Sequence, residues 1–560
     1  MKPHRFTALQ IALATTCLMS GGAFAKTVDT IFVNGKVYTA DQQDNVVQAF
    51  AVDGEKFVSA GTNAQIRKLA GAGTTVIDLK GSFVMPGLTD NHFHGAGGGP
   101  NVPLAEARSM ADVIAALRTA AAGAKPGQII LTNADWHEAQ LVEKRKPTTS
   151  DLDAASTTVP IVVLRGGHSI FLNSVALAKF GVTESTPVPA GGAIEKTPDG
   201  ELTGELVDSA KRLVDIPPPP PLTIDEVIRI QKVMNAFGAT AVRIPGAVMG
   251  GSIVGFAENA RQLHNRGELN LRYTVLRPGP GFAGSTLESL QTGPQQGEGD
   301  EWVRFDGVKL AVDGGFEGAH FGHPYEEPYG KNGTYKGIAL FPPEKTRDDV
   351  IALNNMGWHV AVHAAGDEGI EQTLNAFEAA DKIKPIKDAR WSLEHAFIYH
   401  EGQLERLKRL NIHMSVQDHL YLAAPSMEMF WGRQWADKVS PAKTYTDAGL
   451  PVSGGTDAPV IPPSPLWALY HFASRDTMNS GVFGVVEALP RPQVLRMFTI
   501  NYAQLIGADA VRGSIEAGKL ADFAVFDTDL LSGPVTAIRD AKALATYVGG
   551  RQVYKASSSK

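Results

Sequence analysis

The chain has 560 residues, a formal net charge of −7 and a globular composition with 43% hydrophobic and 20% charged residues. This length exceeds one ordinary domain and is sufficient for a large barrel with additions. A mildly acidic chain lacks the basic footprint of proteins that bind nucleic acid or anionic membranes, so we expect neither partner.

The first 25 residues have the pattern of a secretory signal peptide. Lys2 and Arg5 supply a positive start, residues 6–19 form a mostly apolar run, and residues 23–25 (AFA) resemble a cleavage site. The run is too short for a convincing membrane span, although an uncleaved anchor is the alternative. We therefore expect an exported protein, located in the periplasm or secreted.

The single cysteine, Cys17, lies inside this predicted signal peptide. The mature chain is therefore expected to have no disulfide and no thiol nucleophile. Because no later segment offers about 18 consecutive apolar residues, we expect no membrane contact after cleavage.

Short strand-like segments gather near both ends of the chain, separated by turn residues. They lie at residues 30–38, 49–58, 75–79, 82–85, 521–526 and 545–554. We predict that residues 26–85 and 506–560 form one small β-sandwich from both termini. Two unrelated caps are the alternative that composition leaves open.

Between these ends, strands alternate with helical stretches, which is typical of a parallel sheet with crossover helices. We predict eight barrel strands within residues 86–505. They end near His94, Arg243, Leu276, Lys309, His363, His395, Gln417 and Asp457. The predicted fold is therefore α/β, a (β/α)₈ TIM barrel.

This strand count requires an insertion after the first barrel strand, over residues of about 96–222. The insertion has its own predicted strands, at residues 129–132 and 161–164, and closes with five prolines at 217–221. Placing those two strands in the barrel would give ten strands instead of eight. We therefore expect them to lie outside the barrel.

Polar residues end five of the predicted strands, at the end of the barrel where active sites form. His92 and His94 are two positions apart, so a strand would point them to the same face, and paired imidazoles suit zinc. Each such residue alone has an ordinary structural explanation, but barrel geometry makes these strand ends converge. The other members of the set are Lys309, His363, His395 and Asp457.

The order H-x-H, Lys, His, His, Asp resembles the binuclear metal signature of the amidohydrolase superfamily. Residues 82–94 (SFVMPGLTDNHFH) and 513–522 (GSIEAGKLAD) are similar to its first-strand and C-terminal motifs. Residues 200–205 (GELTGE), 363–367 (HAAGD) and 394–396 (EHA) are similar to the branch that contains N-substituted formamide deformylase and its YtcJ-like relatives.

The chain departs from that branch in one segment. The branch has a D-G-S-L-G-S-R type of run after the fourth strand, whereas residues 313–320 read DGGFEGAH here. Because this loop borders the expected pocket, the preferred substrate is expected to differ from that of the branch.

The resemblance implies one or two zinc ions. The implied ligands are His92, His94 and Asp457 for the first ion and His363 and His395 for the second. Lys309, carboxylated by CO₂, would bridge them, because a free ammonium has no lone pair for a metal; a mononuclear site is the alternative. Asp457 would accept the proton of a metal-activated water.

Further residues are candidates for contact with a small-molecule substrate. They are His168, Arg243, Asn173, Trp136 and His320. His168 is also a catalytic candidate as an oxyanion ligand, with a loop cap as the equal alternative. Arg243 is suited to a substrate carboxylate or to a structural ion pair, and core packing is favoured for Trp136. His359 is expected inside the barrel.

These patterns predict an enzyme that cleaves a non-peptide C–N bond in an N-formyl, N-acyl or cyclic amide. A lyase or decarboxylase, or an esterase or lactonase, could use the same residues. An exported binding protein on a decayed barrel is disfavoured, because all six expected metal positions are filled. The sequence leaves open the substrate, the metal and the formation of a homo-oligomer.

Overall fold

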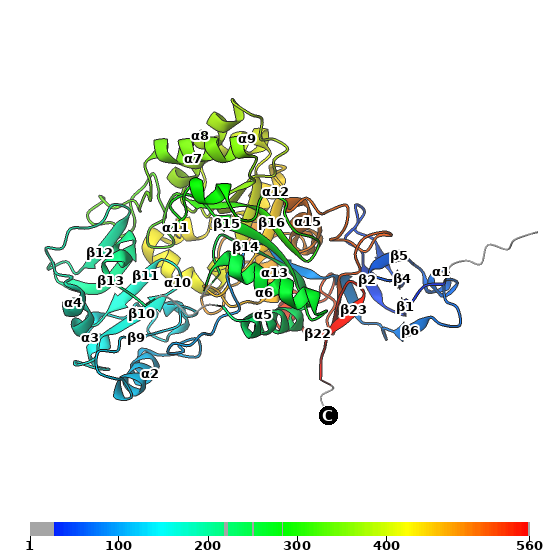
Figure 1. Cartoon of the computed structure of the whole chain (residues 1–560), viewed down its shortest axis with the longest axis horizontal. Coiled ribbons are helices and arrows are strands. Elements are labelled where there is room, and N and C mark those ends of the chain that lie inside the picture. Colours follow the sequence, from blue (N-terminus) through cyan, green and yellow to red (C-terminus); the bar gives the residue numbers. More distant parts are fainter. Residues whose placement is uncertain (1–26, 218–221, 249–250, 283, 558–560) are drawn as a thin grey trace, which may run out of the picture.

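The computed structural model describes residues 27–217, 222–248, 251–282 and 284–557. The predicted signal peptide and prolines 218–221 lie outside these residues. Within the described chain, no helix is both long enough and apolar enough to cross a membrane. Figure 1 shows a central barrel between a lobe on the left, which contains β9–β13, and a group of strands on the right.

Eight parallel strands form the central sheet, which confirms the predicted TIM barrel. They are β8 (Leu88–Asp90), β14 (Ala239–Pro245), β15 (Arg272–Pro278), β16 (Val303–Ala311), β17 (Val360–Ala364), β18 (Ser392–His395), β19 (His413–Gln417) and β20 (Val452–Gly455). The first and last strands meet through a hydrogen bond from the Asn91 N–H to the Gly454 carbonyl (3.2 Å) and a parallel bridge between Phe93 and Ala458. The sheet is thus nearly closed.

Amphipathic helices cover the outside of the barrel. They include α5 (Ile224–Ala236), α6 (Ile253–Asn265), α7 (Pro343–Met356), α8 (Asp367–Asp381) and α9 (Glu401–Leu410). In α5, the Thr223 side chain accepts a hydrogen bond from the Glu226 N–H and so caps the first turn. Val227, Ile230 and Met234 follow at helical spacing and are buried against the sheet.

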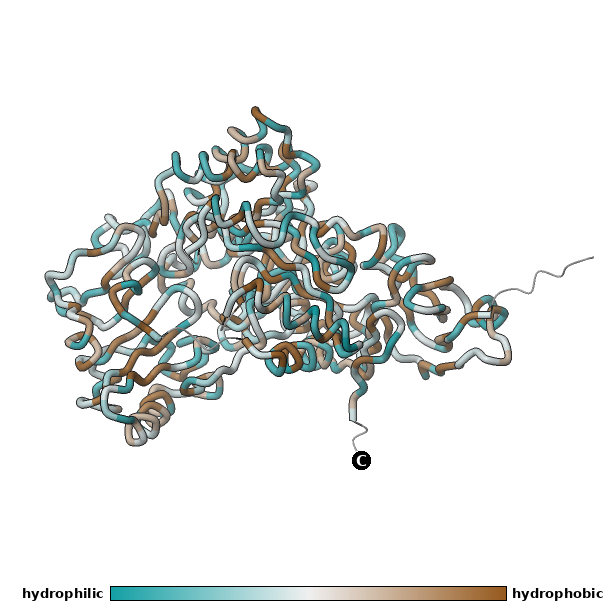
Figure 2. Tube along the Cα trace, viewed as in Figure 1, coloured by the Kyte–Doolittle hydropathy of each residue, from teal (hydrophilic) through white to brown (hydrophobic). Residues whose placement is uncertain are grey.

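Residues between β8 and β14 form a separate lobe with its own five-stranded sheet. The sheet order is β12 (Gly192–Lys196), β13 (Leu202–Asp208), β11 (Ser169–Leu172), β10 (Ile161–Arg165) and β9 (Ile130–Leu131). Hydrophobic residues dominate its strands, as the brown tube of Figure 2 shows, and they form two clusters of their own. The prediction that these strands stay outside the barrel is confirmed.

Strands near the chain ends form two further sheets, the first from the N-terminal part alone and the second from both ends. One has the order β5 (Lys56–Gly61), β4 (Ala49–Asp53), β1 (Thr30–Val33), β6 (Thr75–Asp78). The other has the order β23 (Arg551–Lys555), β22 (Ala543–Val548), β21 (Phe523–Phe526), β7 (Phe83–Pro86), β2 (Lys36–Tyr38), β3 (Val46–Val47). Both contribute to one aromatic cluster, in which the ring of Phe523 lies 5.0 Å from Phe32 and 4.4 Å from Tyr547.

A buried ion pair joins the barrel to the second of these sheets. Arg272, at the start of β15, donates two hydrogen bonds to the carboxylate of Asp522 (2.8 and 3.0 Å). Its guanidinium also lies over the ring of Trp302, 4.3 Å from the centroid. These contacts fix the barrel against the segment that leads into β21.

Candidate metal centre

The six residues predicted as metal ligands all line one cavity of about 570 Å³ at the C-terminal ends of the barrel strands. They are His92, His94, Lys309, His363, His395 and Asp457. This volume lies within the usual range of about 300–1,000 Å³ for small-molecule sites. The barrel therefore brings together residues that are hundreds of positions apart in the sequence.

The tightest part of the cluster consists of His92, His395 and Asp457. One nitrogen of each imidazole and one carboxylate oxygen lie within 4.8 Å of one another. Lys309 Nζ is 3.3 Å from His92 Nε2, and His94 Nε2 is 3.3 Å from Asp457 Oδ1. Two imidazoles and a carboxylate at this separation form a donor set that suits a divalent cation such as zinc.

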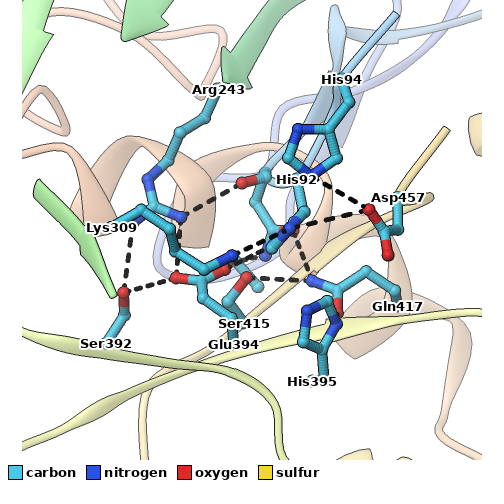
Figure 3. Close-up of polar contacts among 12 residues, drawn as sticks. His92, His94, Arg243, Lys309, Ser392, Glu394, His395, Ser415, Gln417 and Asp457 are labelled. Atoms are coloured by element: carbon cyan, nitrogen blue, oxygen red, sulfur yellow. Dashed lines mark hydrogen bonds and ion pairs between the residues drawn. The ribbon is translucent and has the colours of Figure 1, made fainter. Parts of the chain in front are cut away.

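Hydrogen bonds behind the histidines orient their rings (Figure 3). Nδ1 of His92 donates to Glu394 Oε2 (2.7 Å), and Nδ1 of His395 donates to Gln417 Oε1 (2.7 Å). Nδ1 of His94 donates to the carbonyl of Ala247 (2.7 Å). Each bond leaves the lone pair on Nε2, which is the arrangement that metal-ligating histidines show.

Burial keeps the central histidines uncharged at neutral pH. Burial and the nearby Lys309 lower the pKa of His92 to about 3, against the opposing effect of Asp457. Burial is also the largest cause that lowers the pKa of His363 and of His395 well below the usual value. Neutral imidazole is the form that binds metals, so the electrostatics agree with the donor geometry.

The two charged members of the cluster respond to burial in different ways. Burial raises the pKa of Asp457, but His92 and His419 oppose it and bring the pKa well below the usual value, so that the group is a carboxylate. His419 Nε2 donates to Asp457 Oδ2 (2.9 Å). Burial lowers the pKa of Lys309 to about 8, so that the uncharged amine is more populated near neutrality than in an ordinary lysine.

His363 is held differently from the other three histidines. Its Nε2 donates to the carbonyl of Gly314 (3.1 Å), and its ring lies 4.5 Å from that of His395. The loop that supplies Gly314 is fixed by Asp313, whose carboxylate accepts the N–H groups of Ala365 and Gly366. The segment that departs from the formamide deformylase branch therefore contacts a predicted ligand directly.

His168 reaches the same cavity from the inserted lobe. Its Nδ1 donates to Asp208 Oδ1 (2.7 Å), and its ring lies 5.5 Å from that of His363. Burial lowers the pKa of His168, but Asp208 more than compensates, and the net shift is upward. The inserted lobe thus adds a hydrogen-bond donor to a pocket whose floor comes from the barrel.

Arg243 requires a correction, because it does not line the cavity. It is fully buried inside the barrel, where Nη1 donates to Glu394 Oε1 (2.9 Å) and Nη2 donates to Ser392 Oγ (3.1 Å). Its charge is therefore balanced by a structural carboxylate, which is the ion-pair alternative that the sequence also allows.

Three other substrate candidates also lie outside the cavity lining. Asn173 is the N-cap of α4 (Ser174–Phe180), with its side chain bonded to Ser156, Val159, Ile161 and Ala176. The Trp136 indole N–H donates to the Leu164 carbonyl (2.7 Å) within the core of the lobe. The His320 N–H donates to Asp313 Oδ2 (3.1 Å). The side chains of Asn173 and Trp136 are thus committed to structural contacts, whereas the bond of His320 comes from its backbone.

Sequence reasoning missed the residues that support the ligands, namely Glu394, Gln417 and His419. Strand alternation predicts that Glu394 and His395 point to opposite faces. His395 instead adopts a left-handed conformation (φ 75°), so Glu394 and His395 both point into the barrel. Asp457 has a left-handed conformation as well (φ 61°). Such conformations are uncommon outside glycine and mark places where the surroundings dictate the backbone.

Comparisons with known proteins agree with this geometry. Residues 75–554 match the sequence model of the Amidohydrolase family. Protein LONG AFTER FAR-RED 3 of Arabidopsis thaliana is 29% identical over 548 residues, covering 94% of this chain and 91% of that protein. N-substituted formamide deformylase of Arthrobacter pascens is 27% identical over 555 residues, covering 95% and 99%.

The fold has solved counterparts. The crystal structure of an uncharacterized metal-dependent hydrolase from Pyrococcus horikoshii superposes with a TM-score of 0.66 and 22% identity, covering 90% of this chain and 99% of that one. The barrel, the cavity at its C-terminal end and the family match all point to one class of protein. The chain belongs to the amidohydrolase family of metal-dependent hydrolases.

Proposed function

We propose that this protein hydrolyses a C–N bond other than a peptide bond, in a small N-formyl, N-acyl or cyclic amide. The observation that carries the proposal is the convergence of His92, His395 and Asp457 with Lys309 in one cavity. The likeness to N-substituted formamide deformylase, which extends over nearly the full length of both chains, supports this choice of bond.

The donor set fits one or two zinc ions. His92, His94 and Asp457 would hold the first, and His363 and His395 the second, with carboxylated Lys309 between them. The lowered pKa of Lys309 favours that modification, because only the uncharged amine reacts with CO₂. A divalent ion bound here supplies a water that ionises near neutral pH and polarises a carbonyl.

Asp457 is suited to move the proton. It is a carboxylate at neutral pH, and Oδ2 is fixed by His419 while Oδ1 faces His94. In this role it accepts a proton from the attacking water and later passes that proton to the nitrogen of the leaving amine. The buried His419 contact holds the carboxylate in one orientation throughout.

His168 is suited to stabilise the developing negative charge on the carbonyl oxygen. Its Nδ1 is occupied by Asp208, which fixes the ring and leaves Nε2 for the cavity. The upward pKa shift favours a protonated ring, and a charged donor strengthens as the oxygen becomes negative.

The test is an assay of the purified protein, loaded with zinc and bicarbonate, against N-formyl amines, N-acyl amino acids, small lactams and aryl esters. Each assay is run with and without a chelator. Chelator-sensitive release of an amine is the expected result. Turnover that is confined to esters, or that survives removal of the metal, contradicts the proposal.

A further inference from the structure

The cavity has a second wall that the proposed chemistry does not use. The short helix η2 (Ser209–Leu213) of the inserted lobe follows β13 and places Lys211 and Arg212 in the cavity lining. Lys211 is half-buried and Arg212 is exposed at the surface. Two consecutive cationic residues therefore line the cavity, and their positive charge needs a partner.

Neither cation forms an ion pair with a carboxylate in the part of the chain that the structure describes. Lys211 Nζ donates to the carbonyl of Gly167, which is uncharged. Asp208 is the carboxylate that most strongly opposes the lowering of the Lys211 pKa by burial, but the ion pair of Asp208 is with His168 (2.7 Å). Asp208 thus offsets part of the charge of Lys211, and the charge of Arg212 is left for a ligand to balance.

The other charges of the cavity wall compensate one another. Arg165 donates to Glu317 Oε1 (2.5 Å) and to both oxygens of Glu138 (2.7 and 2.8 Å). Lys146 lies between Glu317 (3.5 Å) and Glu205 (2.7 Å), and burial raises the pKa of Glu205. Glu317, the carboxylate of this group that lines the cavity, is thus paired with two cations.

Apolar side chains share the cavity lining with the cationic wall and the metal ligands. They are Phe282, Phe316, Leu340, Phe341, Phe397 and Val460. These side chains suit the apolar body of a ligand, whereas a guanidinium matches a carboxylate with two parallel hydrogen bonds. A ligand that satisfies both surfaces has an apolar group and an anionic end.

We propose that Lys211 and Arg212 bind the carboxylate of the substrate, so that the preferred substrates are N-formyl or N-acyl derivatives of apolar amino acids. This inference rests on the proposed amide hydrolysis. In such a substrate the amide carbon is bonded to the nitrogen, and the nitrogen is bonded to the α-carbon that bears the carboxylate. Amide and carboxylate are thus separate anchors, one at the metal ligands and one at η2.

The activity test compares N-formyl-phenylalanine with N-formyl-phenethylamine, which differ only in the carboxylate. We expect kcat/KM to be at least about tenfold higher for the acid, the size expected of hydrogen bonds to a charged group. Arg212→Met reduces this ratio to near one by lowering the value for the acid alone. The control Arg266→Met removes another exposed arginine, the C-cap of α6, and leaves the ratio unchanged.

A binding test separates this inference from the proposed reaction. Isothermal titration of the chelator-treated protein with 3-phenylpropanoate and with 3-phenylpropan-1-ol measures the carboxylate contribution without any metal. Tighter binding of the acid by at least about tenfold, lost in Arg212→Met, supports the inference even if no amide is hydrolysed. Equal binding of the two probes overturns it, and does so without affecting the amide hydrolysis itself.

Discussion

At the scale of single residues, the site depends on side chains that touch no substrate. Glu394 is fully buried and lies between Arg243 (2.9 Å) and His92 (2.7 Å), as Figure 3 shows. Arg243 is the largest influence that lowers the Glu394 pKa against burial, and the group remains a carboxylate. That charge fixes which nitrogen of His92 carries its proton.

Replacement of Glu394 by glutamine tests this dependence. Glu394→Gln removes the negative charge between Arg243 and His92, and we expect metal affinity to fall by about 10–100-fold. Metal content after dialysis against a graded zinc buffer measures the change. Glu401→Gln, at an exposed position at the start of α9, is the control. Unchanged zinc retention in Glu394→Gln would show that the ring orientation has another cause.

Asp457 gives a second prediction at this scale. Asp457→Asn preserves the shape of the side chain but removes the proton acceptor, so kcat on the best amide is expected to fall by about 10²–10⁴-fold. Steady-state kinetics and metal content measured on the same preparation separate the loss of the base from the loss of the ion. A kcat within about fivefold of the parent protein, with metal retained, contradicts the assigned role.

At the scale of elements, the barrel could be predicted from the sequence because polar residues mark the ends of its apolar strands. Lys309, His363 and His395 lie at or near the ends of their strands as expected. The first strand differs, since β8 ends at Asp90 and His92 lies beyond it. The rings of His92 and His94 are nevertheless 5.1 Å apart. Residues 91–94 continue alongside the last strand, because their backbone donates hydrogen bonds to the carbonyls of Gly454 and Ala458.

The partners of buried polar groups could not be predicted in this way. Arg243 pairs with Glu394, 151 positions away in the sequence, and spacing rules carry no information about that contact. The sequence makes Asn173 a candidate for the pocket, although an asparagine before an apolar run is also a common helix cap, and that is its role. Local patterns predict elements, whereas tertiary contacts decide which polar side chains remain free for a ligand.

Gly455 lies where the last barrel strand, β20, packs closely against the end of the first, β8. A Cβ at Gly455, the final residue of β20, would lie 2.3 Å from Asn91 Oδ1 and 2.6 Å from Asp90 Oδ1. We expect Gly455→Ala to lower the free energy of unfolding by about 1–3 kcal/mol through overpacking. Gly73→Ala is the matched control, since nothing lies within 4 Å of its Cβ. Equal thermal midpoints for both variants would contradict the close approach.

At the scale of the whole molecule, the barrel is fixed to the sheets from the chain ends through the buried pair of Arg272 and Asp522. Arg272→Met leaves the carboxylate buried without its partner, and we expect it to destabilise the protein by about 3–5 kcal/mol. The double variant Arg272→Met/Asp522→Asn removes the uncompensated charge and is expected to recover part of this loss. Urea unfolding measures both variants, and a double variant no more stable than Arg272→Met would argue against a buried charge as the cause.

The position of β7 has a consequence for how the protein is made. This strand pairs with β2 on one side and with β21 on the other. A ribosome releases β7 before the barrel and β21 after it, so one edge of β7 stays unpaired for on the order of tens of seconds at the usual rate of synthesis. An open hydrophobic edge invites pairing with other nascent chains. The yield of active protein should therefore depend on chaperones during translation. Deletion of residues 523–555 removes β21, so the edge of β7 should stay unpaired and the protein should aggregate.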